Sequence, residues 1–512
     1  MPSVTVHIGK PLSFADVVAV ARDREPVAIL PEVADAMAPA RAVVEDAVAA
    51  GETVYGISTG IGDLANVRID TGLALDLQRD IVRSHATAVG VALPAEVVRA
   101  MLLLRARTFA FGVSGVRFEI VERLVALLNA GVHPVVPSQG SLGASGDLAP
   151  LAHLALPLLG EGAAEKDGTV MPGAAALAAA GIEPLTLSYK EGLALVNGTE
   201  MMLAFGILLV ERARDLARTA DVTGAMTLEA CLGTDSAFRE DLVALRKHAG
   251  AQVSAANLRQ LLAGSAIVES HRESDHLVQD AYSLRCMPQV HGAYRDAMRY
   301  VAGTMEAELA SAIDNPTVMV DEGVLLSGGN FHGEALGLAL DHLGLCLTGW
   351  ATIAERRVAR LVDPGLNNGL PAFLTREPGR RSGFMIVQYT AASLVSENRS
   401  LCWPASADSI PSSAGQEDHV SMGATSARKA AAILDNTELV LAIEALAAAQ
   451  GLDLRAPLAP AAGTGAARAA VREVSPFLEE DRPLSEEIAA ARDLVREGPL
   501  LEAVEAAVGP LA

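Results

Sequence analysis

Hydrophobic positions recur with helical spacing along most of the chain from about residue 71 onward. Apolar faces with few helix-breaking residues characterise the segments near 72–90, 95–131, 190–222, 283–313, 333–362 and 423–450. Several of these segments are apolar on nearly every face, which is typical of helices at the centre of a bundle or between subunits. The pattern predicts a mainly α protein built around a long central helical bundle.

The first fifty residues have a mixed pattern. Short apolar runs at Val4–Ile8 and Val27–Leu30 predict strands, and they alternate with amphipathic helices. Ser13 and Asp16 have the spacing of a capping box and predict the start of the first helix. We therefore expect a smaller mixed α/β N-terminal domain at residues 1–110 and a long-helix domain at residues 111–512.

The breaks between the helical segments contain most of the glycine, proline, serine and asparagine clusters. Residues 51–70 have few helix signals and predict a long loop. Further breaks fall at 132–150, 162–173, 314–330, 363–383 and 403–416, and an Ala-rich stretch near 458–470 is also expected to be a loop. A helical scaffold that carries its site on loops is the natural inference.

Composition agrees with a helical fold. The chain has 512 residues, of which 51% are hydrophobic but only 4% aromatic, and this balance favours close-packed helices over a sheet-rich sandwich. Its formal net charge of −22 makes nucleic acid and anionic membrane surfaces unexpected partners. Helices this apolar would expose a large hydrophobic surface in a monomer, which favours an oligomer.

The cysteines suggest a reducing compartment. They are far apart and form no CxxC pair, at Cys231, Cys286, Cys346 and Cys402. This spacing predicts neither a disulfide framework nor a zinc site, and no other metal-ligand cluster stands out. The N-terminus lacks the pattern of a signal peptide, and the uninterrupted apolar runs are too short to span a membrane. We therefore expect a cytoplasmic protein with no membrane partner.

The run from Gly140 to Leu151 contains Ala144-Ser145-Gly146, a tripeptide that can convert itself into an electrophile. Gly146 has no Cβ, so its backbone nitrogen can approach the Ala144 carbonyl and close a five-membered ring. Loss of water from the ring and from the Ser145 side chain leaves an exocyclic methylidene. Ordinary side chains provide no good carbon electrophile, so such a group would take the place of a bound cofactor.

Two other interpretations of this run exist. A tight loop before a helix would also use glycine for positive φ and serine or aspartate as a cap, and it is the commoner explanation of an isolated Ala-Ser-Gly. A serine-hydrolase elbow fits less well, because G-x-S-x-G would need glycine where Asp147 stands. The choice depends on the other motifs in the chain.

The other motifs favour the electrophile interpretation. The segment Ser141–Leu151 resembles the signature of the aromatic amino acid ammonia-lyases. The resemblance continues in the family's order at Tyr55–Gly60, Ser84-His85, Glu191–Thr199, Gln279–Arg285, Gly329–His332 and Gln416–Met422. It implies that Ala144, Ser145 and Gly146 form a 4-methylidene-imidazole-5-one group autocatalytically, with no added cofactor. It also implies a homotetramer in which three subunits line each active site.

The chemistry of this family requires a base, a carboxylate clamp and a pocket for the ring of a small amino acid. The substrate's amino group adds to the methylidene carbon, the base removes a β-proton, and elimination gives an α,β-unsaturated acid and ammonia. The resemblance assigns the base to Tyr55, in a loop at 51–62 that could close as a lid. A free tyrosine has a pKa of about 10, so this role needs positive surroundings. Without the motif, packing or a surface hydrogen bond would explain Tyr55 better.

Arg285 is expected to bind the substrate carboxylate through two parallel hydrogen bonds, although a surface salt bridge is the usual role of an arginine. It follows Tyr282 by three residues, so both side chains could face one side of a helical turn. The resemblance places Tyr282 in the catalytic set, with Asn197 and Gln279 as polar residues around the prosthetic group and the substrate. Phe331 resembles the residue that packs beside the prosthetic ring. A turn at Asn197 and core packing of Phe331 are the alternatives.

Substrate choice depends on a smaller set of residues. His85 occupies the family's selectivity position, but tyrosine-specific lyases and mutases can also carry histidine there. Gln416 and Glu417 begin a block that is similar to the histidine-specific members, and Met385 also matches them. A buried carboxylate such as Glu417 suits a polar imidazole and would be costly beside a phenyl ring. The resemblance therefore implies elimination of ammonia from L-histidine to give urocanate.

Other functions stay open at this point. A tyrosine or phenylalanine ammonia-lyase would use the same machinery, and a 2,3-aminomutase performs the same elimination but returns the ammonia to the β carbon. A non-catalytic helical scaffold is disfavoured by the retention of Tyr55, Ser145, Asn197, Arg285 and Glu417. A serine hydrolase is the weakest option, for the reason given above.

Overall fold

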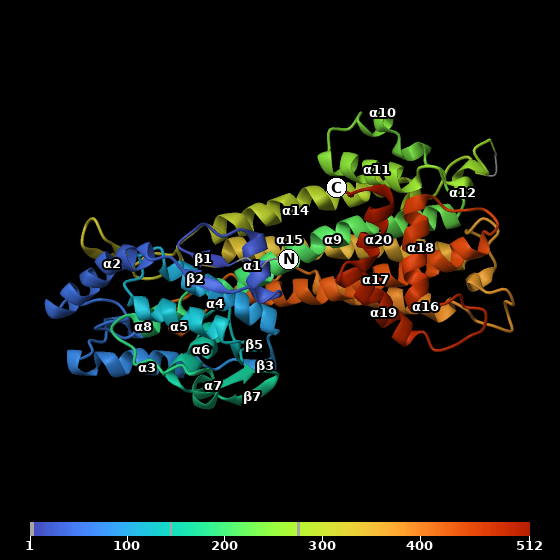
Figure 1. Ribbon diagram of the computed structural model, residues 1–512. Coiled ribbons are helices and arrows are strands. Elements are labelled where there is room, and N and C mark those ends of the chain that lie inside the picture. Colours follow the sequence, from blue (N-terminus) through green and yellow to red (C-terminus); the bar gives the residue numbers. More distant parts are fainter. Residues whose placement is uncertain (1–4, 144–145, 274–276) are drawn as a thin grey trace. The chain divides into compact units, whose positions relative to one another are not determined.

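The computed structural model describes residues 5–143, 146–273 and 277–512 (Figure 1). The chain divides into two compact units, and neither is continuous in sequence. Unit 1 contains Met1–Leu208, Ala302–Asp341 and Pro404–Arg428, and unit 2 contains Leu209–Val301, His342–Trp403 and Lys429–Ala512. The domain boundary expected near residue 110 falls inside unit 1.

Long helices dominate the molecule, as the apolar periodicity predicts. Four of the five boundaries between the units fall within described helices: α9 (Glu200–Ala230), α14 (Met287–Leu309), α15 (Glu334–Val362) and α17 (Gly423–Leu454). Each helix corresponds to a segment predicted from the sequence, which confirms the mainly α fold. Among the described helices, α15 alone is long and apolar enough to cross a membrane, but 67% of its most apolar window is buried inside the protein, as in a core helix.

Unit 1 begins with the two predicted strands. β1 (Val6–Ile8) and β2 (Val27–Ile29) pair in parallel, and α1 (Phe14–Ala21) connects them. The Ser13 hydroxyl accepts a hydrogen bond from the Asp16 N–H at 3.2 Å, and the Asp16 carboxylate accepts one from the Ser13 N–H at 2.8 Å. The predicted capping box is therefore confirmed.

The other described strands of unit 1 form small antiparallel sheets. The pairs are β3 (Val89–Ala92) with β5 (Pro137–Gln139), β4 (Val132–Pro134) with β6 (Ala163–Lys166), β6 with β7 (Thr169–Pro172), and β8 (Thr317–Met319) with β9 (Val324–Leu326). Most of these strands lie in the breaks expected between helical segments. The predicted loops there therefore contain short strands, which hold the connecting backbone in defined positions.

The remaining helices of unit 1 are α2 (Glu32–Ala49), α3 (Ala74–His85), α4 (Ala95–Phe109), α5 (Phe118–Asn129), α6 (Leu148–Ala155), α7 (Gly173–Ala180) and α8 (Glu191–Val196), with 3-10 turns at η1 (Gly62–Asn66), η2 (Thr71–Leu73), η3 (Leu156–Leu159) and η6 (Ser413–Gly415). The single helical segment expected over 95–131 is wrong, because α4 and α5 are separate helices that pack on each other. Gly112 and Gly115 between them have φ angles of +70° and +68°, which interrupt a right-handed helix.

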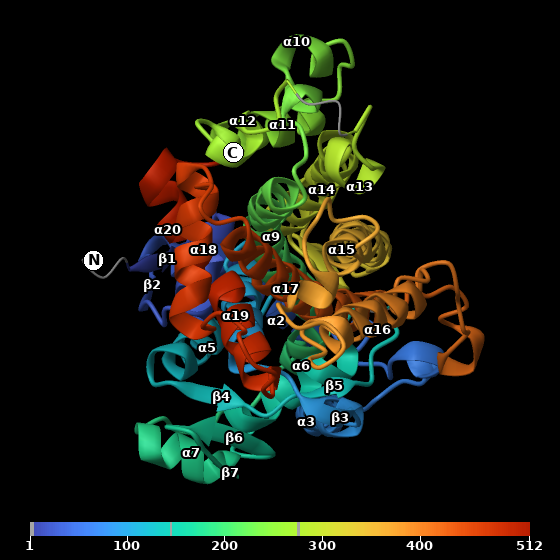
Figure 2. The ribbon, with the colours of Figure 1, turned by 90° about the vertical axis from the view of Figure 1, so that its right-hand side faces the viewer.

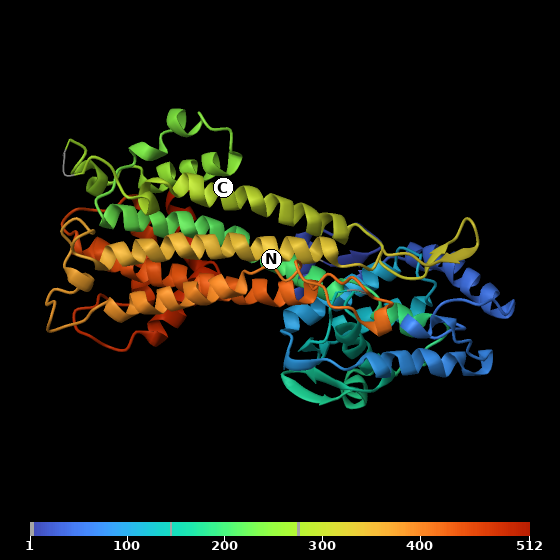
Figure 3. The same cartoon turned by 180° about the vertical axis from the view of Figure 1, so that it is seen from behind.

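In unit 2, α16 (Met385–Leu401) runs alongside the unit-2 segments of α9, α14, α15 and α17, seen nearly end-on in Figure 2 and from the side in Figure 3. Buried polar contacts join these helices: the Arg357 guanidinium binds Glu444, and His291 Nδ1 lies 2.7 Å from the Asp221 carboxylate. Trp350 is fully buried. The predicted bundle of long helices is therefore present in this unit.

The smaller helices of unit 2 are α10 (Glu240–Val243), α11 (Ala249–Leu262), α12 (Ala266–Glu269), α13 (Tyr282–Arg285), α18 (Ala462–Val474), α19 (Ser485–Arg496) and α20 (Pro499–Val508), with 3-10 turns at η4 (Ser236–Phe238) and η5 (Ala372–Leu374). The loop expected near 458–470 is wrong over most of its length, because it contains α18. This helix buries Ala467 and Val471 and packs against α20. Alanine has the highest helix propensity, so packing against a neighbour is enough to make this stretch helical.

Candidate active site

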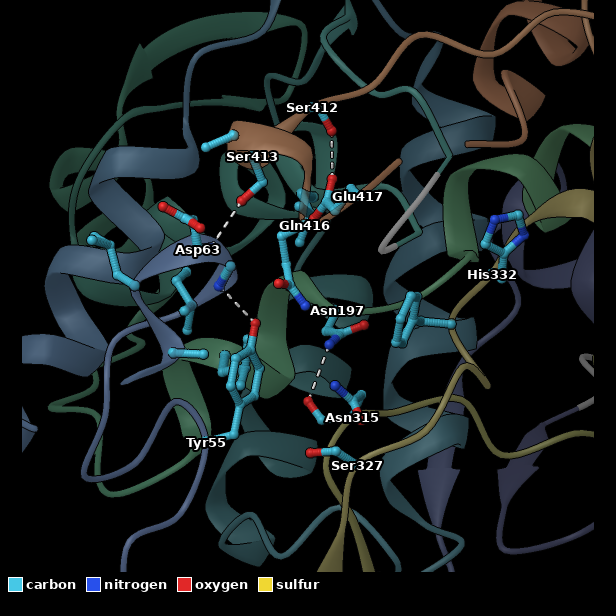
Figure 4. Close-up of a pocket in the computed structure, with 18 of the residues that line it drawn as sticks. Tyr55, Asp63, Asn197, Asn315, Ser327, His332, Ser412, Ser413, Gln416 and Glu417 are labelled. Atoms are coloured by element: carbon cyan, nitrogen blue, oxygen red, sulfur yellow. Dashed lines mark hydrogen bonds between the residues drawn. The ribbon is translucent and has the colours of Figure 1, made fainter. Parts of the chain in front are cut away.

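A cavity of about 900 Å³ lies in unit 1 (Figure 4). Six of the residues predicted from the sequence line it: Tyr55, His85, Asn197, Phe331, Gln416 and Glu417. They come from segments that are far apart in the chain, and mostly from the breaks between predicted helices. The cavity is large enough for a small-molecule ligand. Its described lining contains three histidines and three acidic residues but neither lysine nor arginine.

Tyr55 lies in the loop between α2 and η1, as predicted. Its hydroxyl oxygen accepts a hydrogen bond from the Gly62 N–H at 2.9 Å. Burial raises the pKa of Tyr55, the Gly62 N–H lowers it, and the Glu417 carboxylate raises it, with a net upward direction. These surroundings favour the neutral phenol. The role of Tyr55 as a base therefore needs a positive charge that the described lining of this cavity does not provide.

Glu417 is held at the cavity by its own loop. Ser412 Oγ donates a hydrogen bond to Glu417 Oε2 at 2.7 Å, and the Ser412 N–H donates to the Glu417 carbonyl at 2.9 Å. Ser413 and Ala414, at the tip of the loop, have φ angles of +48° and +54°, a left-handed conformation that such residues adopt only under constraint. The Asp63 N–H donates to Ser413 Oγ at 3.2 Å, which ties this loop to the Tyr55 loop (Figure 4).

Asn197 forms the C-cap of α8 and places its side chain at the cavity. Its Nδ2 donates a hydrogen bond to the Asn315 carbonyl at 3.1 Å, and its own backbone carbonyl accepts one from the Arg105 guanidinium at 2.9 Å. Its Oδ1 is buried and has no hydrogen-bond partner among the described residues. A buried amide oxygen without a donor is unfavourable, so this atom is well suited to accept a hydrogen bond from a ligand.

His85 and Phe331 line the cavity from opposite parts of the chain. His85 is the last residue of α3, and its Nδ1 lies 2.8 Å from the Ile81 carbonyl oxygen. Because a carbonyl only accepts, this contact places a proton on Nδ1. Phe331 precedes His332, whose ring stacks on that of His419 with 5.9 Å between centroids and 4° between planes. This stack joins the segment after β9 to the loop that carries Glu417.

Of the tripeptide predicted to form the prosthetic group, Ala144 and Ser145 lie outside the described residues, and Gly146 lies within them. Gly146 has a φ angle of +74°, and a Cβ there would overlap the Gly198 carbonyl oxygen. The Asp147 N–H donates to that same oxygen at 2.6 Å. Only glycine fits this close backbone approach, beside the turn that follows Asn197. The surroundings therefore fit a tripeptide that needs a compressed backbone to close a ring.

The backbone before the tripeptide is fixed by residues near the start of α17. The Leu142 carbonyl accepts a hydrogen bond from the Met422 N–H at 2.8 Å, and the Gly143 carbonyl accepts one from Ser421 Oγ at 2.9 Å. Ser421 is fully buried. The backbone on the N-terminal side of the tripeptide is thus held by a segment almost three hundred residues later in the sequence.

The residue after the tripeptide is a fully buried acid. The Asp147 carboxylate accepts hydrogen bonds from the Met201 and Met202 N–H groups at the start of α9, both at 3.0 Å. Burial raises the pKa of Asp147 to about 7, and the nearby Glu200 carboxylate also raises it. These contacts fix the C-terminal side of the tripeptide on the first turn of α9.

The remaining predicted site residues belong to unit 2 and do not line the cavity described above. Gln279, Tyr282 and Arg285 line a second cavity of about 470 Å³. The Arg285 guanidinium lies over the Tyr282 ring, 4.7 Å from its centroid, and Tyr282 is 71% exposed. Met385 begins α16 and is half-buried outside both cavities. The predicted residues therefore form two groups within one chain.

Several lining residues escaped the sequence analysis, among them Asp63, Asn315, Ser327, Ser412 and Ser413. Asn315 and Ser412 matter most, because they bind the side chains of Asn197 and Glu417. The sequence offered only turn signals at these positions. His332 and His419 also line the cavity, and both stand inside blocks that carry the family resemblance.

Comparison with known proteins places the chain in a class. The profile of a family described as aromatic amino acid lyase matches residues 12–473. The chain belongs to this family of carbon–nitrogen lyases, and the resemblance inferred from its motifs is confirmed.

Individual relatives narrow the class. The histidine ammonia-lyase of Sorangium cellulosum is 53% identical and covers 98% of this chain and 99% of its own. That of Gloeobacter violaceus is 54% identical, with 98% of each chain covered. Among solved structures, histidine ammonia-lyase from Trypanosoma cruzi superposes with a TM-score of 0.90 at 42% identity, covering 99% of this chain and 96% of its own. Tyrosine aminomutase from Streptomyces globisporus superposes with a TM-score of 0.93 at 37% identity, covering 99% of this chain and 100% of its own.

Proposed function

We propose that the protein is a histidine ammonia-lyase, which eliminates ammonia from L-histidine and releases urocanate. The observation that carries this proposal is the Glu417 carboxylate, held by Ser412 in a cavity that Tyr55 and Asn197 also line. A carboxylate can accept a hydrogen bond from an imidazole N–H, whereas a phenyl ring offers it no hydrogen-bond donor. Near-full-length identity of about half to curated histidine ammonia-lyases supports the same substrate.

The residues around Gly146 and Asn197 fit a methylidene-imidazolone group formed from Ala144, Ser145 and Gly146. Such a group would supply an electrophilic carbon for the substrate's amino group. Asn197 Oδ1, which has no hydrogen-bond partner among the described residues, would orient the bound ligand by accepting a hydrogen bond from it. Tyr55 would take the β-proton of the substrate at its phenolic oxygen.

The division of the predicted residues between two cavities supports active sites shared between subunits, as in the homotetramer that the family resemblance implies. The cavity in unit 1 has no arginine in its described lining, while Arg285 lines another cavity in unit 2 beside an exposed tyrosine. A neighbouring subunit would bring Arg285 to bind the substrate carboxylate and to favour the Tyr55 phenolate. Ile386 and Tyr389 on α16 are 58% and 60% exposed, and burial between subunits would remove this apolar surface from water.

A cytoplasmic location is supported by the cysteines. Cys231, Cys286, Cys346 and Cys402 are all free thiols in the structure. This state suits a reducing compartment. Fractionation of cells that express the protein, followed by detection in the cytoplasmic fraction, tests the location directly.

The function is tested with three substrates. Purified protein is incubated with L-histidine, L-tyrosine and L-phenylalanine in turn, and the near-ultraviolet absorbance of each conjugated acid is followed. Urocanate as the sole product supports the proposal, whereas a product from tyrosine or phenylalanine alone contradicts it. A 2,3-aminomutase is the second candidate because a tyrosine aminomutase has almost the same fold. The appearance of a β-amino acid would favour that activity.

A further inference from the structure

Lys190 and Asp314 form a fully buried ion pair in unit 1. Lys190 Nζ lies 2.7 Å from Asp314 Oδ2, and both side chains have no exposed surface. Neither residue is among the described residues that line the cavity. Removing two charges from water is so unfavourable that a buried ion pair is weak evidence for a contribution to stability. A role in fixing local geometry is the better explanation, and the contacts of Asp314 show which geometry is fixed.

Asp314 connects the ion pair to the cavity through the next residue. Its other carboxylate oxygen, Oδ1, accepts a hydrogen bond from the Asn315 N–H at 2.7 Å. The Asn315 carbonyl accepts the hydrogen bond from Asn197 Nδ2, and Asn315 Oδ1 accepts one from the Gly328 N–H at 2.9 Å. The Asn315 backbone is therefore bound by Asp314 at its nitrogen and by the Asn197 side chain at its oxygen.

Helix α8 is attached to this segment at both ends. Lys190 is its N-cap and binds the Asp314 carboxylate, and Asn197 is its C-cap and donates to the Asn315 carbonyl. Arg105 adds a further connection, because its guanidinium donates to the Asn197 carbonyl at 2.9 Å and to the Ile313 carbonyl at 3.3 Å. The helix has only six residues, so these connections fix its two ends and the Asn197 backbone and side chain relative to residues 313–315.

We infer that the Lys190–Asp314 pair is a positioning device for Asn197: it fixes the Asn315 peptide so that the Asn197 amide presents to the ligand its Oδ1, which has no hydrogen-bond partner among the described residues. Lys190 and Asp314 act only through Asn315 and touch no ligand themselves. This inference rests on the proposed function, because it concerns the geometry needed for ammonia elimination. A misplacement of about 1 Å in a group that orients a substrate lowers turnover on the order of a hundredfold.

The test is a double-mutant cycle with Asn197. Asp314→Asn keeps an oxygen that can accept from the Asn315 N–H but removes the charge that holds Lys190. We expect it to lower kcat for urocanate formation by roughly tenfold to a hundredfold. In an Asn197→Ala background, the same change should lower kcat by less than about twofold, because its effect passes through the amide that is already missing. Equal losses in both backgrounds would overturn the inference.

Glu438→Gln is the matched control. Glu438 is a buried partner of Arg212 in unit 2, at 2.6 Å, and lines neither cavity. It should lower the thermal unfolding temperature as Asp314→Asn does while leaving kcat within about twofold. A loss of kcat as large as that of Asp314→Asn would mean that general destabilisation explains both. If Asp314→Asn does not fold, Lys190→Gln combined with Asp314→Asn removes both charges and takes its place in the cycle.

A crystal structure of Asp314→Asn separates this inference from the proposed function. We expect the distance from Asn197 Nδ2 to the Asn315 carbonyl oxygen to exceed the limit of a hydrogen bond, about 3.5 Å. An unmoved Asn197 amide overturns the inference and leaves the proposed function standing. A wild-type protein that makes no urocanate overturns the proposed function, and the position of Asn197 in the variant still decides whether the ion pair positions it.

Discussion

The Glu417 side chain lines a cavity that has no lysine or arginine in its described lining. Ser412 binds one of its oxygens, and the strained loop between the two residues holds the carboxylate in place. Such strain persists where the surrounding structure constrains it, and it is concentrated at binding sites. The same loop is tied to the Tyr55 loop by the contact between Asp63 and Ser413. The loop that carries Glu417, predicted to recognise the substrate ring, is therefore hydrogen-bonded to the loop that carries Tyr55, the predicted base.

Replacing Glu417 with glutamine should lower kcat/KM for L-histidine by roughly a hundredfold. The amide keeps the size of the side chain but loses the charge that a polar imidazole favours. Steady-state urocanate formation measures the effect. Glu322→Gln, in the exposed turn between β8 and β9, is the control and should leave kcat/KM unchanged. An unchanged kcat/KM in the Glu417 variant would show that the imidazole is recognised elsewhere.

Asp147 makes stability depend on pH. Its pKa rises from 3.8 to about 7 in the folded protein because the carboxyl group is buried. Between these values the folded chain keeps a proton that the unfolded chain releases, so stability falls as pH rises, by up to about 1.4 kcal/mol per pH unit, and is level above about pH 7. Asp147→Asn removes this term. We therefore expect the difference in thermal unfolding temperature, wild type minus variant, to decrease from about pH 5 to about pH 7.

The control for this prediction is Thr169→Ser, at an exposed position on β7 whose side chain does not titrate. Its unfolding temperature relative to the wild type should be independent of pH over the same range. A difference between wild type and Asp147→Asn that stays constant from about pH 5 to about pH 8 would contradict the buried, protonated acid.

Residues with predicted catalytic or binding roles were easier to identify from the sequence than the residues that position them by hydrogen bonds. Tyr55, His85, Asn197, Phe331, Gln416 and Glu417 stand in recognisable blocks, and the structure brings them to one cavity. Asn315 and Ser412 do not stand out, because asparagine and serine in loops are ordinary turn residues. Their importance comes from hydrogen bonds to residues that only the folded chain brings near.

At the scale of elements, the turn before α6 requires a glycine at position 146. Gly146→Ala should prevent ring closure, because a Cβ there would overlap the Gly198 carbonyl and the φ angle of +74° disfavours any side chain. Intact-mass measurement checks this directly: the wild type should lack the mass of two water molecules and the variant should not. Gly181→Ala is the control, since Gly181 has a similar φ of +68° but open space around it. It should keep the mass deficit, and a deficit in Gly146→Ala as well would refute the role of this glycine.

Element boundaries were predicted less well than element types. The periodicity of residues 95–131 runs on through Gly112 and Gly115, whose left-handed φ angles end α4 before α5 begins. The Ala-rich stretch near 458–470 was expected to be a loop, but Ala467 and Val471 lie buried on one face of α18, which packs against α20. The first difference comes from local glycine conformations, and the second comes with a tertiary contact.

The division of the whole molecule was the least predictable feature. Periodicity continues without a break across the boundaries between units 1 and 2, because most of these boundaries lie inside long helices such as α9 and α17. Only the boundary at Trp403 and Pro404 coincides with a predicted break, the one at 403–416. Only contacts between distant stretches of chain define the units, and such contacts are not encoded in any single segment.

The proposed homotetramer with shared active sites predicts complementation between inactive subunits. Tyr55→Phe and Arg285→Ala should each lower activity on the order of a hundredfold or more when expressed alone. In randomly mixed tetramers, a site that takes Tyr55 and Arg285 from different subunits has both native residues in about one quarter of cases. Co-expression of the two variants should therefore restore activity to about that fraction of the wild type. No recovery in co-purified mixed tetramers would mean that both residues act within one subunit.

The hydrogen bonds from Ser421 and Met422 to the backbone before the tripeptide set the order of events during synthesis. A ribosome translates the Ala-Ser-Gly long before it reaches these residues, so the emerging polypeptide lacks the clamp that positions its future electrophile. The proposed methylidene-imidazolone group would therefore mature only after residues 421–422 have left the exit tunnel. Chains truncated before these residues would keep an open Ala-Ser-Gly backbone.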